Sequence, residues 1–319
     1  MNFSDRKNVF GEDGSLRIPI GRYSVLHNTS LNGKDMAEQN IFRLFVPLVL
    51  LMTVLSGCNT PIKNDVDPLD IPFPYQWVGN IDQAHFNEPS GIVFHPGRGT
   101  LFVVGDEGDV CEIQKDGTLI KQKRIRHADF EGITFDPSTG LLYIAIEGEE
   151  KIIELDPEDF SVLREFPVER IFQGAVVLKS GGQGIEAISF VPDPKHPQGG
   201  TFYVANQGFD LEDKEDPSAI FEVEAPLKSG ASGDLTAKIV RSFSIGVIDL
   251  AGSHYDRASD LIYVISDVTN TFFEITRTGK VLRAYAFPGD NQEGITVDDE
   301  GFVYIAQDSG GIIKVKWDK

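Results

Sequence analysis

The chain has 319 residues, and its 49 acidic against 29 basic residues give a formal net charge of −20. This balance argues against nucleic-acid binding, which depends on basic residues, and against docking of the folded domain on an anionic lipid surface. It favours cations, metals or basic partners. Hydrophobic residues form 41% of the chain, enough for a large core, and two cysteines provide no disulfide framework.

The amino-terminal part carries the signature of an export signal. Residues 44–55 form an apolar run that is too short to span a bilayer but has the length of the apolar region of a signal peptide. Arg43 precedes the run, and Leu-Ser-Gly-Cys, ending at Cys58, follows it. This order resembles the lipobox of bacterial lipoproteins; a plain secretory signal is the alternative. We therefore predict that Cys58 is lipidated and anchors the protein in the cell envelope, with the folded domain on the periplasmic or extracytoplasmic side of a bacterial membrane.

The same signal divides the chain into four parts. Met36 lies 22 residues before Cys58, a normal signal length, so residues 1–35 are a non-translated or a disordered extension. The signal peptide then spans residues 36–57. Residues 58–74 form a tether, where four prolines indicate a semi-rigid spacer, and residues 75–319 form one domain.

Five similar segments follow one another after residue 85. Each contains a small residue before a short alternating strand, and these small residues are Gly91, Gly132, Ala187, Gly252 and Gly294. A second strand of Tyr-Ile-Ala type follows, and then a third strand with one charge between two apolar residues. A fourth strand closes four units, at residues 119–125, 162–166, 237–243 and 281–287. Four-stranded units of about 40–50 residues are typical of β-propeller blades.

The fifth unit ends at Lys319, directly after its third strand. Residues 75–79 look like the missing fourth strand, so we predict that they complete the last blade and close the ring. The predicted fold is all-β, a five-bladed β-propeller. Six blades are the alternative, with the sixth between residues 166 and 184 or in the insertions of the third unit. No second-strand motif occurs there, which favours five.

Two positions of the repeat are rich in carboxylates. The residue before the small residue is Ser90, Glu131, Glu186, Ala251 or Glu293. The residue after the second strand is Asp106, Glu147, Gln207, Asp267 or Asp308. Because both positions lie at the same end of a hairpin, we expect the two columns to surround one mouth of the central channel.

Converging carboxylates raise one another's pKa unless a cation neutralises them. Ca²⁺ accepts six to eight oxygen ligands in flexible geometry, whereas the scattered histidines and the lack of a Cys-x-x-Cys pair disfavour soft metals. We therefore predict a calcium site with ligands from Glu131, Glu186, Glu293, Asp106, Asp267 and Asp308. For each residue alone, the capping of a turn is the alternative.

The lipobox-like segment, the five repeats and the Tyr-Ile-Ala strands together resemble the SdiA-regulated (YjiK-like) domain family, over roughly residues 70–319. The resemblance implies an envelope-associated five-bladed propeller, distantly similar to NHL-repeat proteins. It also implies calcium at the carboxylate positions named above, and it brings no assigned activity. Ser90 and Ala251 interrupt the glutamate column, so we expect a site without five-fold symmetry.

Two functions are compatible with these features. The first is a calcium-stabilised binding or scaffold protein that presents the propeller face to a protein or small-molecule partner. The absence of a nucleophile motif such as Gly-x-Ser-x-Gly favours it. The alternative is a metal-dependent hydrolase of lactonase or phosphoesterase type, in which the metal polarises a substrate oxygen and a carboxylate acts as base. Its candidate residues would be Glu131, Glu186, Glu293 and Asp267.

Overall fold

The computed structural model describes residues 71–82, 86–230 and 233–319. The predictions for the extension, the signal peptide, Cys58 and most of the tether lie outside these residues. The described part contains 22 strands. Within it, no helix has the length and the apolar character needed to cross a bilayer.

All but two of the strands form five four-stranded antiparallel sheets, which are the blades. The first consists of β2 (Pro89–His95), β3 (Thr100–Gly105), β4 (Asp109–Ile113) and β5 (Leu119–Arg124). The second consists of β6 (Phe130–Phe135), β7 (Leu142–Ile146), β8 (Lys151–Leu155) and β9 (Val162–Pro167). The third consists of β12 (Ile185–Pro192), β13 (Gly200–Asn206), β14 (Ala219–Glu224) and β15 (Lys238–Phe243).

The last two blades follow the same plan. The fourth consists of β16 (Leu250–Asp256), β17 (Leu261–Ser266), β18 (Thr271–Thr276) and β19 (Val281–Ala286). The fifth consists of β20 (Gln292–Val297), β21 (Phe302–Gln307), β22 (Ile312–Trp317) and β1 (Tyr75–Asn80).

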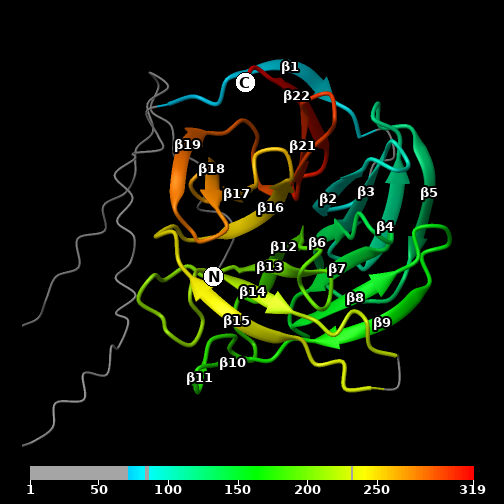
Figure 1. Cartoon of the computed structure of the whole chain (residues 1–319). Helices are drawn as coiled ribbons and strands as arrows, with labels where there is room; N and C mark the ends of the chain where they lie inside the picture. Colours follow the sequence, from blue (N-terminus) through cyan, green and yellow to red (C-terminus); the bar gives the residue numbers. More distant parts are fainter. Residues whose placement is uncertain (1–70, 83–85, 231–232) are drawn as a thin grey trace, which may run out of the picture. The chain divides into compact units, whose positions relative to one another are not determined.

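The first strands of the blades, β2, β6, β12, β16 and β20, contact one another in cyclic order. Figure 1 shows the blades arranged in a ring around these inner strands. The chain is therefore a five-bladed β-propeller, as the repeat predicted. The alternative of six blades is wrong. Residues 166–184 contribute only the end of β9 and a small hairpin of β10 (Ile171–Phe172) and β11 (Ala175–Val176).

The hydrophobic core lies between the blades. Buried side chains form five clusters, and each cluster combines residues of two successive blades. Between the second and third blades, for example, the rings of Tyr143 and Phe202 lie 4.9 Å apart. Successive side chains of a strand point to opposite faces, so the buried apolar runs of the three inner strands contribute to the clusters on both sides of a blade.

Strand β1 closes the ring by pairing antiparallel with β22, with Tyr75 opposite Trp317. Residues 71–74 fall within the predicted tether, yet they contact the fourth blade. The backbone N–H of Phe73 donates a 2.9 Å hydrogen bond to the carbonyl of Ala286, and the ring of Phe73 is buried. The amino-terminal segment therefore joins the fourth and fifth blades.

Candidate metal centre

The inner strand of every blade begins with a β-bulge. In β2, Pro89 and Gly91 both pair with β3, which leaves Ser90 as an extra residue between them. The corresponding residues of the other blades are Glu131, Glu186, Ala251 and Glu293. Because a bulge changes the direction of the side chain that it inserts, this irregularity turns one column of the repeat toward the channel.

The small residue that follows each bulge permits the close approach of neighbouring inner strands. A Cβ atom on Gly91 would lie 2.5 Å from the carbonyl oxygen of Glu131, and one on Gly252 would lie 2.4 Å from that of Glu293. Both distances are too short for any side chain. Below the mouth the channel accordingly narrows to a void of about 10 Å³.

At the mouth, a polar cavity of about 120 Å³ is lined by Ser90, Asp106, Glu131, Glu186, Gln207, Glu293 and Asp308. Both predicted columns contribute to it. The structure brings five of the six predicted ligands together here, namely Glu131, Glu186, Glu293, Asp106 and Asp308. No lysine or arginine of the described residues lines this cavity.

Asp267, the sixth predicted ligand, lies outside the cavity lining. Its Oδ1 accepts a 3.0 Å hydrogen bond from the backbone N–H of Gln292, which is the kind of contact that stabilises a turn. Two carboxylates outside the predicted ligand set lie close to Glu131 instead. Glu147 belongs to the second column of the repeat, and Asp129 lies two residues before Glu131. These two positions in the sequence could have indicated that both side chains approach Glu131.

Two clusters of three acidic side chains lie at the mouth and have one residue in common. Oxygen atoms of Asp106, Asp129 and Glu131 lie within 4.8 Å of one another, and the same holds for Glu131, Glu147 and Glu186. Glu131 belongs to both groups, whose members come from the first three blades. Ala251 supplies no carboxylate from the fourth blade, and the arrangement therefore lacks five-fold symmetry.

Burial and mutual repulsion raise the pKa values of these carboxyl groups. Burial, followed by repulsion from a neighbouring carboxylate, holds the pKa of Glu131 and that of Glu186 well above the ordinary range. The same two causes raise the pKa of Glu147 to about 8. Burial also raises the pKa of Asp106 to about 6, although the Ser90 hydroxyl donates a hydrogen bond to it. Protons or a cation must therefore compensate this charge.

The chemistry of the cavity fits a hard cation. Its lining offers carboxylate, amide and hydroxyl oxygens, and among the described residues it includes no histidine and no cysteine. Oxygen-only sites of this kind suit Ca²⁺ or Mg²⁺, whereas softer metals prefer nitrogen and sulfur ligands. The two clusters of three acidic residues that share Glu131 could thus hold a metal ion.

The fold and this site define a five-bladed β-propeller with an acidic, oxygen-lined cavity at one mouth of its channel. The chain belongs to the SdiA-regulated family, whose family model matches residues 78–309. This match confirms the resemblance inferred from the repeat. No curated protein matches the sequence.

Two solved structures are similar to the chain at low sequence identity. The crystal structure of glutaminyl cyclase from Myxococcus xanthus has a TM-score of 0.51 and 12% sequence identity, and covers 77% of this chain and 97% of its own. The β-propeller domain of Cps50 (Swd1) from Myceliophteria thermophila has a TM-score of 0.44 and 12% identity, with 76% and 99% covered. At such low identity, the similarity to the cyclase shows the fold alone.

Proposed function

We propose that this protein is an envelope-anchored, calcium-binding β-propeller that acts by binding a partner. Two clusters of three carboxylates share Glu131 and carry the proposal. Asp106, Glu131 and Glu186 from these clusters line a cavity whose described lining contains no basic residue. A structure that concentrates buried carboxylates without a cationic side chain needs another source of positive charge. A divalent cation supplies that charge, and it binds only to the folded chain.

Calcium is favoured over other metals by the number and kind of oxygens. Five carboxylates contribute to the two groups, and Gln207 and Ser90 add neutral oxygens to the lining. Ca²⁺ accepts six to eight such ligands without strict geometry, whereas Mg²⁺ demands a near-ideal octahedron and retains several waters. The cavity of about 120 Å³ also leaves room for water beside an ion.

Calorimetric titration of the full-length protein tests this site. We expect a Ca²⁺ site in the wild type and a loss of affinity of at least about tenfold in Glu131→Gln, because this substitution removes the charge common to both groups. Asp299→Asn is the matched control, since Asp299 belongs to a third acidic group that lies beside Lys115 and has a largely exposed side chain. Unchanged affinity in Glu131→Gln, or lost affinity in Asp299→Asn, would contradict the proposal.

The membrane anchor forms a separate part of the proposal. The lipobox-like sequence that ends at Cys58 supports lipidation, and the prolines of residues 58–74 support a spacer between lipid and propeller. We expect the wild-type protein in the membrane fraction of a bacterial host and a Cys58→Ala variant in the soluble fraction. Equal membrane association of both proteins would argue against a lipid anchor at this cysteine.

The hydrolase alternative also has an observation in its favour. The pKa of Glu147, raised to about 8, lies close to neutral pH, where a carboxyl group can act in general acid–base catalysis. Assays of a panel of lactones and phosphate esters, with and without Ca²⁺, separate the two candidates. Calcium-dependent turnover that Glu147→Gln abolishes would favour the hydrolase, and calcium binding without turnover favours the binding protein.

A further inference from the structure

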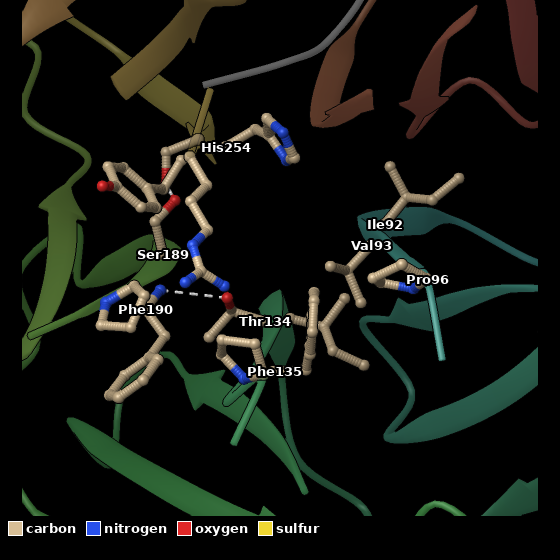
Figure 2. A pocket seen from close by; sticks show the side chains of 14 residues that line it. Ile92, Val93, Pro96, Thr134, Phe135, Ser189, Phe190 and His254 are labelled. Carbon is tan, nitrogen blue, oxygen red and sulfur yellow. Dashed lines mark hydrogen bonds between the residues drawn. The ribbon is translucent and has the colours of Figure 1, made fainter. Parts of the chain in front are cut away.

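A second cavity, of about 170 Å³, lies at the opposite end of the channel from the metal centre. The carboxyl-terminal halves of the inner strands β2, β6, β12 and β16 form its walls. Figure 2 shows His254 at one side of this space, Ile92, Val93 and Pro96 at another, and Phe135 facing it from below. The rim residues Pro96 and Pro137 are exposed, whereas Ile92 and Ile133 are buried deeper in the channel.

The fourth blade departs from the repeat where it faces this cavity. Ser253 takes the place of an isoleucine that the other four blades share, at residues 92, 133, 188 and 295. Arg257 takes the place of a proline that three other blades share, at residues 96, 137 and 192. With His254, these residues make the fourth blade the most polar wall of a cavity whose other walls carry isoleucine, valine, phenylalanine and proline side chains beside Thr134 and Ser189.

Arg257 differs from the other arginines of the described chain. Each of the others forms an ion pair with a carboxylate, whereas Arg257 forms none with a described residue. The side chain is exposed at the cavity, and none of the described residues that line the cavity is acidic. In a chain with a net charge of −20, an acid-free cavity with an unpaired guanidinium is suited to an anion.

His254 offers a second donor. Thr296 Oγ1 accepts a 3.0 Å hydrogen bond from the backbone N–H of Phe94, so its own hydrogen is available to Nδ1 of His254, 3.2 Å away. We assign the imidazole hydrogen to Nε2 on this basis, and Nε2 forms no hydrogen bond with a described residue. Burial lowers the pKa of His254 to about 4, which keeps the ring neutral at pH 7.

We propose that this cavity binds a small monocarboxylate with an apolar body, whose carboxylate meets Arg257 and His254. Arginine presents paired N–H donors that match the two oxygens of a carboxylate. The isoleucine, phenylalanine and proline side chains of the walls would cover the apolar body. A cavity of about 150 Å³ is large enough for benzene, so a ligand about the size of benzoate fits this one. This site is independent of the metal centre.

Ligand-observed nuclear magnetic resonance titrations of the full-length protein test the proposal with benzoate and hexanoate. Their uncharged amides, benzamide and hexanamide, serve as controls of nearly equal shape. We expect saturable binding of the acids, weaker binding of the amides, and a loss of affinity for the acids of at least about tenfold in Arg257→Gln. Arg283→Gln is the matched control, because Arg283 is also exposed but lies on the outer strand β19 and pairs with Glu274.

Binding of the acids should depend on the positive charge of residue 257 and on the position of this cavity away from the metal centre. Arg257→Lys should restore part of the affinity, and EDTA should leave it unchanged, because no metal takes part. The proposal is overturned if neither acid binds, if acids and amides bind equally, or if Arg257→Gln binds the acids as the wild type does. Loss of binding in EDTA would also overturn it, because the acid would then bind at the metal centre.

Discussion

In the presence of EDTA, the Tm of the protein is expected to fall by about 5–10 °C as the pH rises from 5 to 8. The carboxyl groups at the channel mouth have raised pKa values in the folded chain, about 6 for Asp106 and about 8 for Glu147. Proton binding therefore stabilises the fold fully below the unfolded pKa values, near pH 4, and this stabilisation is lost as the pH rises through the folded values. Saturating calcium should abolish the fall, because the ion replaces the protons. Thermal unfolding monitored by circular dichroism measures both profiles.

Variants in which an amide replaces a carboxylate test the same electrostatic prediction at single residues. Without metal at pH 8, Glu131→Gln should melt at a higher temperature than the wild type, because the amide is neutral in this buried position without binding a proton or a cation. With calcium the order should reverse, since the variant lacks a ligand. Glu215→Gln, at an exposed carboxylate in the connection between β13 and β14, should change neither profile. A wild-type Tm that does not depend on pH in EDTA would contradict the electrostatic account.

Phe73→Ala is expected to lower the free energy of unfolding by about 3–5 kcal/mol, the range for a buried phenylalanine. The side chain is 2% exposed. It packs against the rings of Tyr75, Phe272, Tyr285, Phe287 and Trp317. The substitution leaves a cavity at the joint between the fourth and fifth blades, where the amino-terminal segment docks. Urea unfolding of the full-length protein measures the loss.

Trp77→Ala is the matched control for the substitution of Phe73 at the contact between the fourth and fifth blades. Trp77 lies on β1, in the same amino-terminal segment as Phe73, but it is 56% exposed, so its removal should cost no more than about 0.5 kcal/mol. If both substitutions destabilise the protein equally, the closing strand contributes through its backbone pairing and not through the buried ring. If Phe73→Ala has no effect, the docking of residues 71–74 does not contribute to stability.

The sequence predicted the blades because each one consists of strands joined by short hairpins, and such local patterns repeat visibly along the chain. It predicted the closing strand because the fifth unit lacked its own fourth strand. It also predicted that five of the six proposed ligands, all except Asp267, meet at the channel mouth. When the repeats are arranged in a ring, residues at the same position of the repeat lie at the same height along the channel. Glu131, Glu186 and Glu293 share one such position and therefore converge.

The remaining features depend on packing that no local pattern records. The carboxylates gather around Glu131 because Asp129 and Glu147 approach it, while Asp267 bonds to the backbone of Gln292. The second cavity was also missed. Ser253, His254 and Arg257 are visible as departures from the repeat, but only the assembled ring shows that they face one shared space.

Ring closure by β1 has a consequence for the order in which the protein can fold. The strand made first in the domain pairs with the strand made last, and Gln76 bonds to Asp318 across 242 positions of the chain. A growing polypeptide cannot complete the ring until β22 has been synthesised. Contacts of such long sequence separation also slow folding. This delay would keep the new chain unfolded for longer. An unfolded chain suits a protein whose proposed location requires it to cross a membrane before it folds.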